Sequence, residues 1–136
     1  IEAGRMQLTC HEVEIEPVIS SRADSFATAT GRTVVAGLDE TLTALANEQA
    51  LVTVIDHLLD NAAKYSPGGE QVEVCAVADS DYIRIDVTDH GIGMDSEQAA
   101  HCFDKFWQAE STDVRRFGGT GIGLYIVQSL VEAMGG

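Results

Sequence analysis

The chain has 136 residues, with 22 acidic and 8 basic side chains, and its formal net charge is −14 at pH 7. The length fits one domain, and a hydrophobic content of 45% with only two prolines favours a folded protein over a disordered one. Such a negative surface makes nucleic acid and anionic membrane lipid unfavourable partners, because both carry negative charge themselves.

The start of the chain and its apolar runs give no sign of a targeting or membrane segment. The opening residues IEAGRMQLTCHE lack the charged and apolar regions of a signal peptide. No window reaches the roughly 18 consecutive apolar residues that indicate a transmembrane helix. Cys10, Cys75 and Cys102 lie far apart and without metal-ligand spacing, so we expect reduced and largely buried thiols.

The first predicted elements are a short strand and a helix. Val13 and Ile15 alternate with acidic residues, which predicts a strand within residues 11–17. Pro17 suits the first turn of the following helix, which its apolar periodicity extends to about Thr30.

A second strand, a long helix and a hairpin are predicted next. The strand is expected over residues 33–36 and the helix over about 47–65. This helix has a wide apolar stripe, formed by Leu51, Val54, Ile55, Leu58, Leu59 and Ala62. Apolar residues alternate over 72–78 and again over 83–87, with Asp79-Ser80-Asp81 between them, which predicts a β-hairpin.

The last part of the chain is predicted to contain a short helix, a loop and a final helix. They are expected at about 96–103, at 108–119 and from near Gly121 onwards. The order of elements lacks the strict strand–helix alternation of a doubly wound fold. It favours a single α+β domain over residues 1–136, with helices packed on one face of a mixed sheet, and residues 1–16 as its leading segment and first strand.

An acidic residue and two glycines, Asp89, Gly91 and Gly93, follow the second hairpin strand. A carboxylate there can accept a hydrogen bond from an exocyclic amine, and the glycines let the backbone approach a flat ring closely. Taken alone, the same pattern also fits an ordinary turn after a strand.

A glycine-rich segment, residues 118–124, leads into the last predicted helix. Backbone N–H groups at such a helix start can bind an anion, and the helix dipole adds partial positive charge. The segment is no Walker loop, because no Lys-Ser/Thr pair follows its last glycine, and no strand leads directly into it as in the dinucleotide fingerprint. A flexible hinge is the alternative interpretation.

Three polar residues, His57, Asn61 and Lys64, lie along one stripe of the long helix beside its apolar face. An amide oxygen can bind Mg²⁺, and a lysine one turn further on can reach a phosphate. A solvated helix surface is the alternative interpretation for these residues.

Together these segments resemble the ATP-binding catalytic domain of histidine kinases, in the superfamily that includes gyrase, heat-shock protein 90 and the mismatch repair protein MutL. Four boxes stand in the order of that family: HLLDNAAKYS (57–66), DHGIGM (89–94), FDKFW (103–107) and GGTGIGL (118–124). The similarity extends from about Pro17 to Gly136. It implies a two-layer α/β sandwich and two further strands after the last helix, which this chain, ending at Gly136, lacks.

The resemblance implies a role for each matching residue. Asn61 would coordinate a Mg²⁺ that bridges the phosphates of ATP, and Lys64 would contact a phosphate. Tyr65 would lie beside the nucleoside, and Asp89 would bind the adenine amine. The other nucleotide contacts are implied for Gly91, Gly93, Met94, Gly119, Thr120, Gly121, Ile122, Gly123 and Leu124.

The resemblance also implies a mobile lid over residues 95–118, anchored by Phe103 and Phe106. Packing into the core is an equally good interpretation of these two phenylalanines. Many family members have an arginine shortly after the second of them, where this chain has Gln108. Arg115 or Arg116 would then neutralise the γ-phosphate, with a solvated lid surface as the alternative.

His57 is the most informative departure from the family pattern. Many family members have another asparagine four residues before the magnesium asparagine, and hydrolytic relatives have a glutamate there, which activates water. This chain has His57 at that place. The missing carboxylate favours phosphoryl transfer to a partner over hydrolysis. A role for His57 as a base is a lesser alternative.

His11 does not match the pattern of the family's phosphoacceptor histidine. His11-Glu12-Val13 resembles the start of the family's acceptor box, but the Arg-Thr-Pro that should follow is replaced by Glu14-Ile15-Glu16. We therefore expect His11 to be a strand-edge residue.

The sequence thus predicts a cytoplasmic domain that binds Mg·ATP, within a kinase that is either soluble or membrane-anchored. It would donate the γ-phosphate to a histidine on a separate dimerisation domain, with a response regulator as the indirect partner. A divalent cation and a few basic groups would offset the repulsion between this acidic chain and anionic ATP. The alternatives are a serine kinase and binding module of the anti-sigma type, and a degenerate pseudokinase that only scaffolds.

Overall fold

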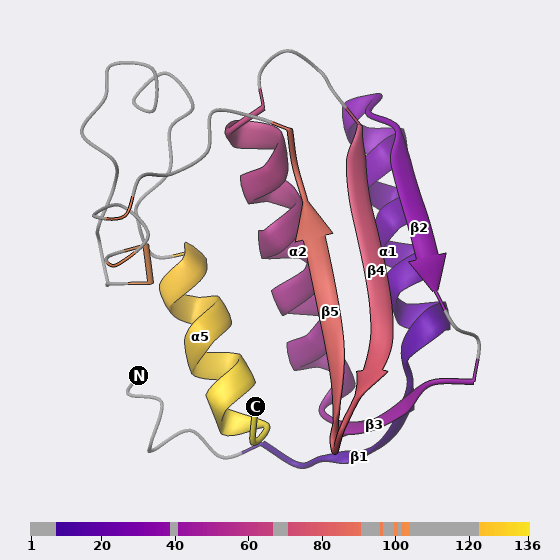
Figure 1. Ribbon diagram of the computed structural model, residues 1–136, viewed down its shortest axis with the longest axis vertical. Coiled ribbons are helices and arrows are strands. Elements are labelled where there is room, and N and C mark those ends of the chain that lie inside the picture. Colours follow the sequence, from indigo (N-terminus) through magenta and orange to yellow (C-terminus); the bar gives the residue numbers. More distant parts are fainter. Residues whose placement is uncertain are drawn as a thin grey trace.

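The computed structural model describes residues 8–38, 41–66, 71–90, 96, 100, 102–103 and 123–136. Its helices and strands are, in chain order, β1 (His11–Glu14), α1 (Ile15–Thr30), β2 (Val34–Leu38), β3 (Thr43–Ala46), α2 (Glu48–Lys64), β4 (Val72–Asp79), β5 (Tyr82–Thr88) and α5 (Gly123–Ala133). Figure 1 shows α1 and α2 behind the sheet of β2, β4 and β5, with α5 beside α2.

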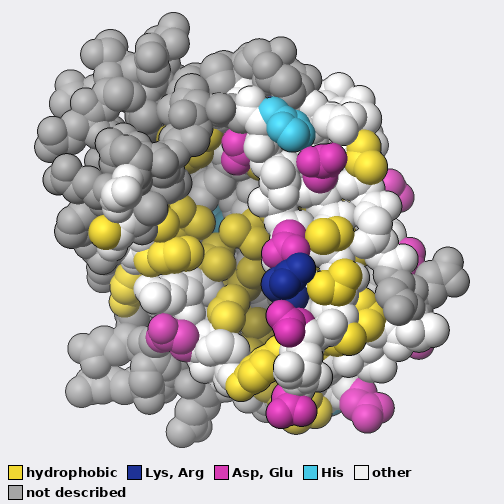
Figure 2. Space-filling model, in the orientation of Figure 1, with side chains coloured by type: hydrophobic (Ala, Val, Ile, Leu, Met, Phe, Trp, Pro, Cys, Tyr) yellow, Lys and Arg dark blue, Asp and Glu magenta, His cyan; other side chains and the backbone are white. Residues whose placement is uncertain are grey.

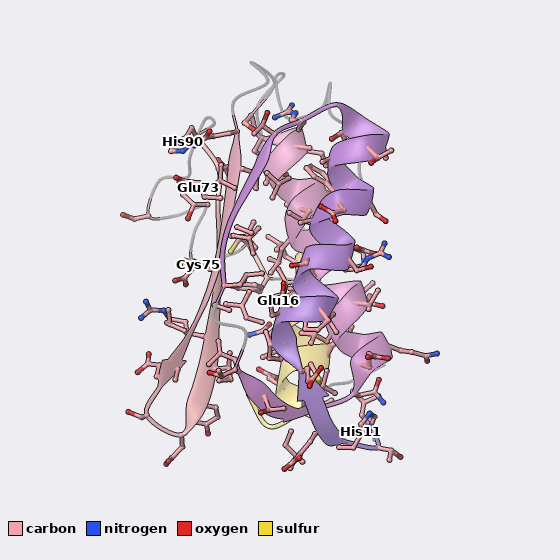
Figure 3. The ribbon with its side chains drawn as sticks, turned by 90° about the vertical axis from the view of Figure 1, so that its right-hand side faces the viewer. His11, Glu16, Glu73, Cys75 and His90 are labelled. Atoms are coloured by element: carbon pink, nitrogen blue, oxygen red, sulfur yellow. The ribbon has the colours of Figure 1, made fainter. Side chains whose placement is uncertain are left out.

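The main sheet is mixed, and β4 is its central strand. β2 pairs with β4 in parallel, with Val34 opposite Val72, and β4 pairs with β5 in antiparallel fashion. A separate antiparallel pair joins β1 to β3. Seen edge-on in Figure 3, the helices lie on one side of the sheet only. The prediction of an α+β sandwich with helices on one face of a mixed sheet is confirmed.

The core lies between this sheet and the helices. Alternate residues of β4, Val72, Val74 and Ala76, are 0–2% exposed, which is the period of two expected of a strand with one covered face. Ile19 of α1 and Ile55 of α2 are fully buried against them. Each such aliphatic side chain contributes about 1.5–3 kcal/mol through burial. The fold thereby fixes α2 firmly against the sheet.

The long helix and the hairpin agree with their predictions. Asn47 caps α2, because its side-chain oxygen accepts a hydrogen bond from the backbone N–H of Ala50 at 3.0 Å. In the hairpin, Asp79 pairs with Tyr82, so the connection is a tight turn of Ser80 and Asp81 rather than three residues. Ser80 takes the left-handed conformation, with φ of 54°.

The first strand ends earlier than predicted. Ile15, which we expected to alternate with Val13 in the strand, is the first residue of α1 and is 2% exposed. Its backbone N–H donates to the carbonyl of Leu42 at 3.1 Å. Pro17 therefore lies at the third position of the helix, still within the first turn, where a missing N–H costs no helical bond.

One strand, β3, was not predicted from the sequence. Its four residues, TALA, show no clear alternation, and alanine is a poor strand former. Pairing with β1 over the full length of both strands specifies it instead. His11 lies at the exposed start of β1, which agrees with the expected strand-edge position (Figure 3).

Some predictions fall on residues outside the described part. Of the short helix expected over 96–103, only residues 96, 100, 102 and 103 are described, and the loop over 108–119 lies outside entirely. The three cysteines are free and each is partly buried, which agrees with the expectation of reduced, largely buried thiols. Among the described helices, none is both long and apolar enough to cross a membrane.

Candidate nucleotide-binding site

The C-terminal half of α2 forms one wall of a small pocket of about 160 Å³. Leu58, Asn61, Ala62 and Tyr65 line it, at the i, i+3, i+4 and i+7 spacing that places residues on one helix face. The helical periodicity of α2 therefore gives it two neighbouring apolar or mixed stripes with different surroundings. One stripe of the helix enters the core, and the neighbouring stripe lines the pocket.

The opposite walls come from β5 and α5. Val87 is near the end of β5, Asp89 follows directly after that strand, and Leu124 is the second residue of α5. Asn61 and Tyr65 thus share one pocket with Asp89 and Leu124, which come from two distant parts of the sequence. An amide, a carboxylate and a phenol in an otherwise apolar frame suit a ligand with a flat ring and a few polar groups.

Tyr65 is half-enclosed, and burial raises the pKa of its phenol. The phenol therefore stays neutral to a higher pH than that of an exposed tyrosine. The backbone N–H of Tyr65 donates to the carbonyl of Asn61 at 3.0 Å and closes the last turn of α2. The same short stretch of backbone therefore fixes the positions of both residues.

The segment that carries Asp89 is tethered to the central strand. His90 Nε2 lies 3.2 Å from Glu73 Oε2 of β4, and the two side chains are 50% and 46% exposed (Figure 3). An exposed pair of this kind contributes about 0–1 kcal/mol. The contact joins two residues far apart in the chain, and no motif in the sequence pointed to it.

Two predicted residues of α2 are not among the pocket-lining residues. His57 and Lys64 are both partly buried on the helix, but neither borders the 160 Å³ pocket. Lys64 is the last residue of α2, where its positive charge interacts favourably with the helix dipole. Phe103, expected to anchor the lid, is 42% exposed and does not line this pocket either.

Many of the predicted site residues lie outside the described part of the chain. These are Gly91, Gly93, Met94, Phe106, Arg115, Arg116, Gly119, Thr120, Gly121 and Ile122. Gly123 is described as the first residue of α5. The lining of the pocket given above is therefore its described lining only.

A larger cavity, of about 630 Å³, lies elsewhere, between β3, β5, α2 and α5. Figure 2 shows its apolar side chains gathered in the hollow beside the sheet. Of the described residues that line it, Asp81 alone is charged, so this lining offers little to hold a phosphate or a metal. We take the smaller pocket as the candidate site, because polar groups converge there.

Metal binding by the protein alone has no support in the described residues. They contain no group of three or more His, Cys, Asp or Glu side chains that could hold a metal ion. Asn61 nevertheless offers an amide oxygen beside the pocket, which is a suitable ligand for a Mg²⁺ that a nucleotide brings with it.

Comparison with known proteins fits this geometry. The sequence model of the histidine kinase-, DNA gyrase B- and HSP90-like ATPases matches residues 46–136, more than half of the chain. The chain belongs to this family. The matched part of this ATPase domain contains every described residue that lines the candidate pocket.

Among curated relatives, the sensor histidine kinase AruS of Pseudomonas aeruginosa is 44% identical over 93 residues. That alignment covers 65% of this chain but only 9% of AruS. The ATPase domain thus spans a small part of the curated relatives that it matches.

Solved structures agree in fold. The mycobacterial sensor histidine kinase MprB matches with a TM-score of 0.79 at 25% identity, covering 90% of this chain and 80% of that one. Full-length ShkA, solved in complex with AMPPNP, matches with a TM-score of 0.78 at 30% identity, covering 96% of this chain and 27% of ShkA.

Proposed function

We propose that this chain is the catalytic part of a sensor histidine kinase, which binds Mg·ATP and donates its γ-phosphate to a histidine on another domain. The observation that carries the proposal is the convergence of Asn61 and Asp89 on one pocket, from α2 and from the end of β5. ShkA, of the same fold, was solved with the ATP analogue AMPPNP, which supports a nucleotide as the ligand.

Within this proposal each wall of the pocket has its own task. Asp89 accepts a hydrogen bond from the adenine amine, and Tyr65 packs beside the nucleoside. Asn61 would supply an amide oxygen to Mg²⁺, and the ion would offset the negative charge of the phosphates. Lys64, one turn further along α2, contacts a phosphate. The glycine segment 118–124 and Met94 complete the nucleotide site.

Phosphoryl transfer in this site depends on position and charge rather than on covalent chemistry by the protein. An imidazole nitrogen of the acceptor histidine bonds to the γ-phosphorus, the bond from that phosphorus to the bridging oxygen breaks, and ADP leaves. Arg115 or Arg116 of the lid neutralises the charge that develops. His57 stands where hydrolytic relatives have glutamate, so water is not activated efficiently and transfer is favoured.

The partners follow from this reaction. The acceptor histidine belongs to a dimerisation and phosphotransfer domain, and a response regulator then receives the phosphoryl group. We place this domain in the cytoplasm, where ATP is available, whether or not the parent kinase is anchored in a membrane. The named relatives are sensor histidine kinases, so the anti-sigma type of serine kinase is not favoured.

Calorimetric titration of the 136-residue chain with ATP, in Mg²⁺ and in EDTA, tests the proposal. Asn61→Ala should weaken Mg·ATP binding by about ten- to hundredfold, the cost of losing one interaction with a charged group, and should change Mg²⁺-free binding much less. Asp60→Ala, an exposed neighbour on the same helix, is the matched control and should bind like wild type. Equal Mg²⁺ dependence in Asn61→Ala and wild type would reject the metal assignment.

A further inference from the structure

Arg32, which lies outside α2, contacts the last turn of that helix both directly and through Ser66. Ser66, which is 1% exposed, donates its hydroxyl to the carbonyl of Ala62 at 2.6 Å. Arg32 then donates from Nη1 to Ser66 Oγ at 2.9 Å and from Nη2 to the carbonyl of Ala63 at 3.2 Å. The last carbonyls of a helix have no partner within it, so these contacts satisfy two of them.

The backbone around Arg32 is itself fixed on both sides. Gly31 ends α1 in the left-handed conformation, with φ of 73°, and its N–H donates to the carbonyl of Ala27 at 2.9 Å. On the other side, the carbonyl of Thr33 accepts a bond from the N–H of Val72 at 3.0 Å, where β2 and β4 begin. Arg32 therefore joins the end of α1 and the start of the sheet to the end of α2.

An arginine suits this position for two physical reasons. Its planar fork can donate to two acceptors in a fixed relative geometry, which a lysine ammonium cannot do. Its positive charge also interacts favourably with the negative end of the helix dipole. The two alanines that it reaches, directly or through Ser66, follow Asn61 immediately in the chain.

We propose that Arg32 is a positioning residue for nucleotide binding: it fixes the last turn of α2 and thereby the places of Asn61 and Tyr65 in the pocket. This inference rests on the proposed function. Without Arg32, the carbonyl of Ala63 loses its donor and the hydroxyl of Ser66, which holds the carbonyl of Ala62, loses its bond to Arg32. The turn then adopts its binding geometry for only part of the time. Apparent affinity falls in proportion to that fraction.

Arg22 provides a matched control, because its guanidinium also joins the first helix to α2. It donates from Nε and Nη2 to Asp56 Oδ1 and Oδ2 at 2.8 and 3.0 Å, away from the last turn of α2. This charge-paired bond raises the pKa of Arg22. Arg22→Ala thus removes two guanidinium hydrogen bonds to α2, as Arg32→Ala removes two from the end of that helix and the residue Ser66, but it does so away from the pocket.

The experiment is calorimetric titration with Mg·ATP of wild type, Arg32→Ala and Arg22→Ala, after urea unfolding has shown each to be folded. We expect Arg32→Ala to bind about tenfold more weakly, and Arg22→Ala to stay within about twofold of wild type. Equal losses in both variants, or none in Arg32→Ala, would overturn the positioning role while leaving the proposed function intact. If wild type itself did not bind Mg·ATP, the proposed function and this inference would both fall.

Two further variants separate positioning from simple loss of stability. Arg32→Lys keeps the charge but not the fork, so it should bind about threefold more weakly than wild type even if Arg32→Ala does not fold. Ser66→Ala removes the intermediate hydroxyl, so the affinity losses of Ser66→Ala and Arg32→Ala should be less than additive in the double variant. Full affinity in Arg32→Lys, or strictly additive losses, would contradict the proposal.

Discussion

Asn61 and Asp89 lie on different elements and still border one pocket of about 160 Å³. Their chemistry and their order in the chain were readable from the sequence, because the boxes around them resemble those of a known family. Two other contacts near the site could not be predicted from the sequence. Arg32 with Ser66 and His90 with Glu73 join residues that no local pattern relates, and only the packed fold brings them together.

Tyr65 gives a prediction in pH. Burial raises the pKa of its phenol above the unfolded value of 10.0, so the folded chain holds this proton more tightly than the unfolded chain does. The free energy of unfolding should therefore fall as pH rises above about 10, through the folded pKa. Tyr65→Phe has no proton to lose and should show a smaller fall.

The measurement is urea unfolding at about pH 8 and about pH 11, where the tyrosine phenol ionises. Tyr82→Phe, at a position that is 64% exposed, controls for the removal of one phenol. An identical fall in Tyr65→Phe and Tyr82→Phe would mean that the pocket does not enclose the Tyr65 side chain as described.

At the scale of elements, α2 is the part of the fold that the sequence predicts best. Seventeen residues with a strong apolar period and a capping Asn47 leave few alternatives to a helix. The strands at the start of the chain are harder to predict, because their pairing decides them. β3 is specified by its partner β1, and Ile15 enters α1 although its alternation with Val13 suited a strand.

The cap of α2 can be tested directly. Asn47 accepts from Ala50 N–H at 3.0 Å and donates from Nδ2 to the carbonyl of Thr9 at 2.9 Å. Asn47→Ala should lower the free energy of unfolding by about 1–2 kcal/mol, because a cap and one further bond are lost. Gln49 is exposed in the first turn of α2, and Gln49→Ala should change the free energy of unfolding by no more than about 0.5 kcal/mol. Equal values for the two variants, measured in urea, would contradict the capping assignment.

At the scale of the whole molecule, two cavities compete as the binding site. The larger cavity of about 630 Å³ is an apolar groove, whereas the pocket of about 160 Å³ contains the amide of Asn61, the carboxylate of Asp89 and the phenol of Tyr65. Size alone would favour the groove, but a polar ligand needs polar partners. The net charge of −14 sharpens this requirement, because an acidic chain binds ATP only where cations and donors are concentrated.

The central claim is that nucleotide binds in the pocket between α2 and the end of β5. The most direct measurement is an NMR titration of the chain with Mg·AMPPNP, following backbone amide signals residue by residue. We predict the largest shift changes at Asn61, Tyr65, Asp89 and Leu124, with little change in the groove at Leu45, Ile83 and Val131. Changes concentrated in the groove, or no saturable changes at all, would contradict the account.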